Sequence, residues 1–123
     1  MQVRKIMRRA HIVDRDISFG EAAKVMSAGH IGALIIVLKK KVAGIVTDSD
    51  ILRQFGKEGN IFEIMNKNVE VIESKEDINV ALDLMKKKKI RHLPVVDKGH
   101  LVGIIAMENV AAHADELGGD FFV

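Results

Sequence analysis

The residues with the clearest chemical potential lie in segment 44–50, which runs from Gly44 to Asp50. Its apolar residues predict a strand that ends at Thr47, and the polar residues that follow favour the start of a helix. Thr47 then offers a hydroxyl and Asp50 a carboxylate on one side of the first helical turn, beside free backbone N–H groups. Such a carboxylate can accept both hydroxyls of a ribose, and the hydroxyl and helix-terminal amides suit a phosphate oxygen. Gly44 allows a flat ring to approach the strand closely.

The same two polar residues have a purely structural interpretation. A threonine followed three positions later by an aspartate can cap the N-terminus of a helix with no ligand present. The spacing of Thr47 and Asp50 fits both interpretations, so the alternative stays open at this point.

Composition sets the general class of the protein. The chain has 123 residues, of which 48% are hydrophobic and 4% aromatic, so one compact domain with an aliphatic core is expected. There are no cysteines, which excludes disulfides and thiolate metal sites. The longest apolar run, residues 31–38, is far shorter than the roughly 20 residues that cross a bilayer. The basic N-terminus has no apolar stretch of signal-peptide length after it, so we expect a soluble cytoplasmic protein with no membrane association.

The charges nearly cancel, with 19 basic and 17 acidic side chains and a net charge of +2. This balance argues against a nucleic-acid partner. The run Lys86–Lys89 is interpreted as the cationic last turn of a helix, which complements the negative end of the helix dipole. Binding of nucleic acid through this run and Arg91 is the alternative, and the overall charge gives it little support.

The sequence is a duplication. When it is shifted by 59 positions against itself, identical residues align along the body of two repeats, 1–58 and 59–117, which leave a tail at 118–123. The aligned pairs are Ala22 with Ala81, Met26 with Met85, Ile31 with Ile90, Leu34 with Leu93, and Gly44-Ile45 with Gly103-Ile104. Near the start of each repeat the match moves by one residue, so that Ile6-Met7 aligns with Ile64-Met65.

Each repeat predicts the order strand, helix, strand, strand, helix, so an α/β (α+β) fold is expected. The first helix of each repeat carries an apolar stripe with helical spacing. The stripe residues are Phe19, Ala22, Ala23 and Met26 in one repeat and Ile78, Ala81, Leu82 and Met85 in the other. Ser18 with Glu21 predicts a capping box at the start of one helix, and Asp77 a cap at the other.

A hairpin follows the first helix in each repeat. Its strands are expected at 31–37 and 42–46 in one repeat and at 90–96 and 101–105 in the other. Pro94 lacks an N–H donor and should therefore lie at a sheet edge or a bulge. The two repeats, each with an apolar sheet face, are expected to pack with pseudo-two-fold symmetry into one module with a cleft on each side.

The duplicated strand-helix-strand-strand-helix unit resembles the CBS domain, named after cystathionine beta-synthase. The resemblance rests on the signature Gly-h-h-Thr-x-x-Asp at 44–50, where h is apolar, and on Ile-Arg-His-Leu-Pro-Val-Val at 90–96. It covers the chain from Val3 to Glu116. The family resemblance implies a tandem pair, often called a Bateman module, that binds AMP, ADP, ATP or S-adenosylmethionine as an effector in a cleft between the repeats.

The resemblance also assigns roles to individual residues. It implies that Asp50 holds the ribose, that Thr47 lies near ribose or phosphate, and that Arg91 and His92 meet the phosphates. By position alone, Ile12 and Val13 line the adenine pocket. From the residues themselves, Arg91 could equally form a surface salt bridge and His92 could be a half-buried strand histidine. The other histidines show no metal-like spacing, so no metal site is expected.

The second repeat departs from the signature. Ala106 replaces the hydroxyl residue and Asn109 replaces the ribose-binding carboxylate. An amide lacks the charge that strengthens a bond to a sugar hydroxyl, a difference of roughly 1 kcal/mol or more. We therefore expect one competent site per chain, organised around Asp50.

Two functions remain after this reading of the sequence. The first is a regulatory sensor that binds an adenosine-containing ligand, forms a homodimer and signals in trans to an unknown partner protein. The alternative is a ligand-free dimerisation or assembly module, in which Thr47 and Asp50 only cap a helix. No duplicated carboxylate pair, nucleophile triad or metal cluster points to an enzyme, so neither catalytic residues nor a catalytic cofactor are expected.

Overall fold

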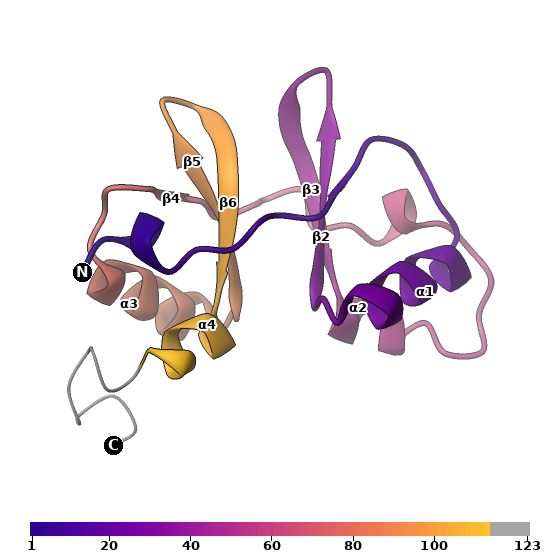
Figure 1. Cartoon of the computed structure of the whole chain (residues 1–123). Coiled ribbons are helices and arrows are strands. Elements are labelled where there is room, and N and C mark those ends of the chain that lie inside the picture. The colour runs from indigo at the N-terminus through magenta and orange to yellow at the C-terminus, as the bar shows by residue number, and fades with distance from the viewer. Residues whose placement is uncertain (114–123) are drawn as a thin grey trace. The chain divides into compact units, whose positions relative to one another are not determined.

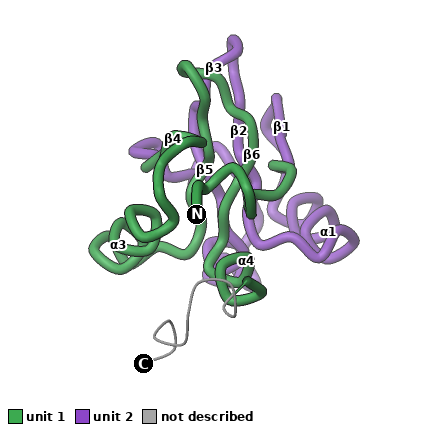
Figure 2. The backbone as a smooth tube through the Cα atoms, turned by 60° about the vertical axis from the view of Figure 1, so that its left-hand side comes forward, with its two compact units in different colours: residues 1–10, 70–123 green, residues 11–69 purple. Residues whose placement is uncertain are grey.

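The computed structural model describes residues 1–113 and divides the chain into two compact units. Unit 2 contains residues 11–69, and unit 1 contains residues 1–10 together with the chain from residue 70 onward (Figure 2). The end of the second predicted repeat and the predicted tail at 118–123 lie outside the described residues.

Unit 2 is built on a three-stranded sheet in the order β1-β2-β3. Its elements in chain order are β1 (Ile12–Val13), α1 (Phe19–Gly29), β2 (Ala33–Leu38), β3 (Lys41–Thr47), α2 (Asp48–Leu52) and the 3-10 turn η2 (Ile61–Glu63). Strands β1 and β2 are parallel, and β2 and β3 form an antiparallel hairpin. Figure 1 shows α1 and α2 beside the same end of this hairpin.

Unit 1 repeats this plan around a second sheet in the order β4-β5-β6. Its elements are the 3-10 turn η1 (Val3–Lys5), β4 (Ile72–Glu73), α3 (Ile78–Lys88), β5 (His92–Asp97), β6 (His100–Ala106) and α4 (Met107–Ala112). The α/β class and the order strand, helix, strand, strand, helix are thereby confirmed for both repeats (Figure 1).

The long helices begin at the predicted capping residues. Ser18 Oγ accepts the Glu21 N–H at 3.1 Å, and the Asp77 carboxylate accepts the Asn79 N–H at 2.9 Å. That backbone hydrogen bond from Asn79 lowers the pKa of Asp77, because it stabilises the charged form. The apolar stripes face the two cores, except that Ala23 is exposed. The buried stripe residues are Phe19, Ala22 and Met26 in α1 and Ile78, Ala81 and Met85 in α3.

Each unit is completed by a segment that precedes, in the sequence, the first strand of the other unit. We call this segment its arm: residues 1–8 in unit 1, which lie before β1, and residues 60–66 in unit 2, which lie before β4. The arm of unit 1 exchanges two backbone hydrogen bonds between Arg8 and Ile104, at 2.8 and 2.9 Å. The arm of unit 2 exchanges two between Asn66 and Ile45, at 2.9 and 3.1 Å. The compact units therefore do not follow the predicted repeat boundaries, because 1–10 and 59–69 each pack with the sequence of the other repeat.

A methionine of each arm covers a glycine of the sheet. A methyl group placed on Gly44 would lie 2.7 Å from Sδ of Met65, and one on Gly103 would lie 2.9 Å from Sδ of Met7. Beside Gly103 the backbone oxygen of Arg8 is also close, at 2.8 Å from such a methyl group. Both glycines thus provide the space in which the arms pack.

Pro94 lies in β5, the central strand of its sheet, so the first of its two expected places, a sheet edge, is wrong, whereas the second, a bulge, agrees with a shift of register close to it. Its partner across the hairpin is Ile104, whose N–H and carbonyl turn away to bond Arg8. The other neighbour, β4, pairs only from Val95 onward, so Pro94 lies beyond the end of that ladder. A proline therefore removes no hydrogen bond from the hairpin ladder. The ladder also shifts register just after it, between Val95 and Val96.

The close contact at Gly44 predicts a specific double-mutant result. Gly44→Ala should lower the free energy of unfolding by about 1–3 kcal/mol, because the added methyl group overlaps Met65. Met65→Ala should cost less in that background than in the wild type, because it removes the overlap. Urea denaturation of the four proteins measures this coupling, and a neutral Gly44→Ala would contradict it.

Unit 1 supplies the control. Gly103→Ala should be equally destabilising, but Met7→Ala should not relieve it, because the backbone oxygen of Arg8 stays in place. If Met7→Ala offset the destabilisation by Gly103→Ala as fully as Met65→Ala offsets that by Gly44→Ala, the contact with the backbone oxygen of Arg8 would not matter and this prediction would be wrong.

The hairpin turns predict a second stability change. Lys39 and Lys40 occupy the left-handed region with φ of 50° and 64°, and Lys98 and Gly99 do so at the equivalent turn with φ of 51° and 81°. A side chain in this conformation costs roughly 1–2 kcal/mol, which glycine avoids. Lys40→Gly should therefore raise the melting midpoint by a few degrees, about 3–6 °C, and Gly99→Lys should lower it similarly. Calorimetry of both variants checks the prediction, and a drop for Lys40→Gly would refute it.

Candidate functional site

Thr47 and Asp50 form a reciprocal capping box at the start of α2. Thr47 Oγ1 accepts the Asp50 N–H at 3.3 Å, and Asp50 Oδ2 accepts the Thr47 N–H at 2.8 Å. The strand before them and the short helix after them hold the two side chains on one face of the first turn. The structural interpretation of this pair is thus correct, and the question is whether the carboxylate can do more than cap.

The carboxylate of Asp50 keeps capacity for further hydrogen bonds. Its Oδ1 forms a close ion pair with the guanidinium of Arg53, one turn further along the chain. Each carboxylate oxygen can accept two hydrogen bonds, so one acceptor position remains on each oxygen beside the Thr47 and Arg53 contacts. The side chain of Asp50 is 21% exposed and that of Arg53 is 67% exposed. The pair is therefore accessible to a ligand.

The equivalent turn in unit 1 has the cap without the charges. Asn109 Oδ1 accepts the Ala106 N–H at 2.8 Å, which reproduces the bond between Asp50 and Thr47. Asn109 is buried, with 3% of its surface exposed. The cap bond itself therefore requires an oxygen acceptor and no carboxylate.

The space at Gly44 is already filled. The side chain of Met65 covers the face where a side chain at Gly44 would project. The geometry therefore accounts for this glycine by the packing of the arm, without the approach of a ligand ring.

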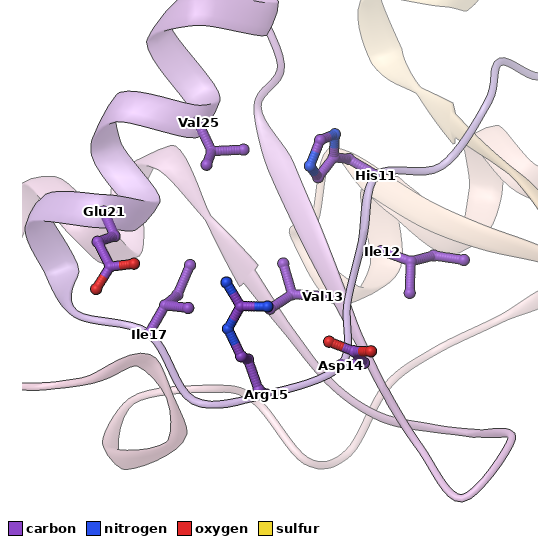
Figure 3. Close-up of a pocket in the computed structure, with 8 residues that line it drawn as sticks. All are labelled: His11, Ile12, Val13, Asp14, Arg15, Ile17, Glu21 and Val25. Carbon is purple, nitrogen blue, oxygen red and sulfur yellow. The ribbon is translucent and has the colours of Figure 1, made fainter.

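Ile12 and Val13 lie on opposite faces of β1, as successive residues of a strand do. Val13 packs toward the core of unit 2, whereas Ile12 is 52% exposed. Figure 3 shows Val13 pointing toward Val25 of α1 and Ile12 pointing away from it. Of the two residues of β1, only Ile12 thus points its apolar side chain away from the core.

A small pocket of about 190 Å³ lies between β1 and α1 (Figure 3). It combines an apolar lining with the charged side chains of Asp14, Arg15 and Glu21. Pockets that enclose drug-sized ligands measure roughly 300–1,000 Å³, so the volume of this pocket lies below that range. Neither Thr47 nor Asp50 lines it.

Arg91 and His92 belong to unit 1, at the start of β5. The Arg91 carbonyl accepts the Met107 N–H at 3.0 Å, which places the Arg91 backbone beside the Ala106–Asn109 turn of its own unit. The Arg91 side chain is exposed and His92 is half-buried. Their contact with phosphates stays a prediction.

The sequence analysis missed Arg53. An acidic residue and an arginine three positions apart on a helix lie on the same face, and this spacing could have identified the pair. Among residues 1–113, no cluster of three or more His, Asp or Glu side chains is placed to hold a metal ion. In this same part of the chain, no helix is both long and apolar enough to cross a membrane.

The two roles of Asp50 predict different consequences for two substitutions. Asp50→Asn should change stability little, because Asn109 makes the same cap bond with an amide oxygen and an exposed ion pair contributes little. Asp50→Ala should lower the free energy of unfolding by about 1 kcal/mol, because the cap is lost. Thermal melts without ligand compare the two variants. An equal loss for both would mean that the ion pair, rather than the cap, stabilises this turn.

Sequence comparison finds known proteins that match most of this chain. It is 28% identical over 108 residues to an uncharacterised 17.7 kDa protein of Acidianus ambivalens, which covers 84% of this chain and 66% of the relative. It is 31% identical over 117 residues to inosine-5'-monophosphate dehydrogenase of Thermoplasma acidophilum, which covers 88% of this chain and 24% of the enzyme. The chain thus spans less than two thirds of the first relative and about a quarter of the second.

The fold has a solved counterpart of nearly the same extent. The CBS domain pair of protein MJ0100, crystallised with 5'-methylthioadenosine and S-adenosyl-L-methionine, superimposes with a TM-score of 0.87 at 30% sequence identity. The match covers 96% of this chain and 98% of that one.

The duplication itself is recognised by the family model. The model of the CBS domain matches residues 3–57 and again residues 61–116. Its two matches agree with the doubled signature and with the repeated order of elements in the two units. The chain therefore belongs to the CBS domain family and contains a tandem pair of CBS domains.

Proposed function

We propose that this chain is a regulatory module that binds an adenosine-containing ligand at Asp50 and signals its presence to a partner protein. In this proposal Asp50 accepts the ribose hydroxyls and Thr47 lies beside the ribose or phosphate. The observation that supports it most is the charge of Asp50. The carboxylate is accessible and has acceptor capacity left, although the cap needs only the amide that stands at Asn109.

The solved relative supports the class of ligand. The CBS domain pair of MJ0100 binds 5'-methylthioadenosine and S-adenosyl-L-methionine, which share an adenosine group. A ribose in that group presents two neighbouring hydroxyls, and Asp50 has one acceptor position left on each oxygen. AMP, ADP, ATP and S-adenosylmethionine are thus the candidate effectors, and Arg91 and His92 are the candidate phosphate contacts.

Two observations support a regulatory role. The site lacks catalytic groups, and in one relative the matched region is only a small part of a larger enzyme. Residues 1–113 present no metal cluster, and Thr47 and Asp50 bond to backbone N–H groups and to Arg53 rather than to an activated nucleophile. In the dehydrogenase of Thermoplasma acidophilum, the matched region is about a quarter of the enzyme. We infer that the module is not catalytic and controls a separate protein, which requires that the ligand bind two of its states with different affinity.

A second candidate function is assembly without a ligand. Leu52 and Phe55, at the end of α2 and just after it, are 72% and 92% exposed. Exposed large apolar side chains that lie close together favour a protein–protein contact, including the homodimer expected from the sequence. In this alternative the Thr47 and Asp50 pair acts only as a cap.

A thermal-melt panel separates the two functions. AMP, ADP, ATP and S-adenosylmethionine are each added to the wild type, Asp50→Asn and Asp48→Asn. Ligand at about a hundred times its dissociation constant should add roughly 2.7 kcal/mol to stability, which raises the midpoint on the order of 10 °C. Asp50→Asn should abolish most of that rise without changing the melt in the absence of ligand.

Asp48→Asn is the matched control, because it removes the same charge from the same helical turn. Asp48 is exposed and its Oδ1 accepts the neighbouring Ser49 N–H, so Asp48→Asn should leave a ligand-induced rise at least as large as that of the wild type. If none of the four ligands moves the midpoint of the wild type, the sensor function is refuted and the assembly function takes its place.

A further inference from the structure

The ion pair between Asp50 and Arg53 occurs in one unit only. Positions 50 and 53 of unit 2 correspond to Asn109 and Ala112 in unit 1. The cap bond survives this exchange at the same length of 2.8 Å, from Thr47 N–H in one unit and Ala106 N–H in the other. The carboxylate and the guanidinium are therefore present together or absent together, and neither is needed to build the turn.

Stability does not explain the pair either. Arg53 is 67% exposed and lies three residues after Asp50, as the C-cap residue of the five-residue helix α2. Exposed pairs at this spacing stabilise a helix by only about 0.3–0.5 kcal/mol, and salt weakens them further. A role in ligand binding explains the presence of both charges in unit 2 better than a role in stability does.

The charges around Asp50 restrict which ligands can approach. Asp48 and Asp50 place two negative charges in the first turn of α2, and Arg53 is the cation in contact with Asp50. A ligand that carries a phosphate would meet repulsion from both carboxylates. A guanidinium at Asp50 offsets this repulsion, and its planar set of donors fits phosphate oxygens.

We propose that Arg53 selects anionic ligands, so that the effector is an adenine nucleotide with a phosphate group rather than adenosine or the cationic S-adenosylmethionine. This inference rests on the proposed ribose contact of Asp50. When the ribose hydroxyls occupy the carboxylate, the long and exposed side chain of Arg53 turns its guanidinium to the phosphate. Arg53 is thus a specificity-determining residue of the site.

Isothermal titration of three probes tests the role of Arg53. AMP, adenosine and S-adenosylmethionine are titrated into the wild type, Arg53→Ala and Arg53→Lys. Arg53→Ala should lower the affinity for AMP roughly tenfold, because a charge-assisted hydrogen bond is lost. It should change the affinity for adenosine by no more than about twofold. Arg53→Lys should recover part of the AMP affinity, because it restores the positive charge without the planar set of donors.

Lys24→Ala supplies the matched control. Lys24 is exposed on α1 of the same unit, so its removal changes the net charge equally and should leave all three affinities unchanged. Melts without ligand verify that each variant is folded.

Two results would overturn the inference while the proposed function stands. One is an equal loss of AMP and adenosine affinity in Arg53→Ala, which would mean that Arg53 only orients Asp50. The other is a wild type that binds S-adenosylmethionine more tightly than AMP. A wild type that binds none of these probes and neither ADP nor ATP refutes the proposed function, and the selectivity of Arg53 with it.

Discussion

The pairing of each arm with the last strand of its sheet is the constraint on which the two units depend. Two backbone hydrogen bonds fix Arg8 to Ile104, and two more fix Asn66 to Ile45. These bonds set the position at which Met7 and Met65 cover the glycines of β6 and β3. They also bring the buried residues Val3, Ile6 and Ile61 into the cores. Without its arm, each sheet would have an open edge and a core that lacks part of its apolar surface.

The repeated elements could be predicted because local patterns specify them. The apolar stripes of α1 and α3 and the caps at Ser18 and Asp77 are local signals, and the structure follows them. The exchange of the arms could not be predicted with the same ease, because no local pattern states which of two similar sheets a segment joins. The sequence does set the arms apart from the rest of each repeat, since the arms align at a shift of 58 positions and the rest of the repeats at 59.

The site was harder to predict than the fold because one geometry serves two purposes. A cap and a ribose contact both need an oxygen acceptor three residues after the strand end, so spacing alone could not separate them. The second unit provides the comparison that separates them, since Asn109 retains the cap bond and lacks the charge. Gly44 was assigned to the ligand from its type, whereas its space is taken by Met65, a residue 21 positions away. Contacts of that kind follow from tertiary packing and leave no mark in a seven-residue motif.

The exchanged arms also determine when each unit can fold during synthesis. Every segment of unit 2 lies within residues 11–69, so this unit is complete once residue 69 has left the ribosome. Unit 1 has to keep residues 1–10 unpaired until β6 is made, because Arg8 bonds to Ile104. Contacts at such sequence separation form slowly, since a long loop must close before they stabilise the chain. Residues 1–10 are thus among the last of the two units to reach their place, and the unit with the Asp50 carboxylate is finished before the other.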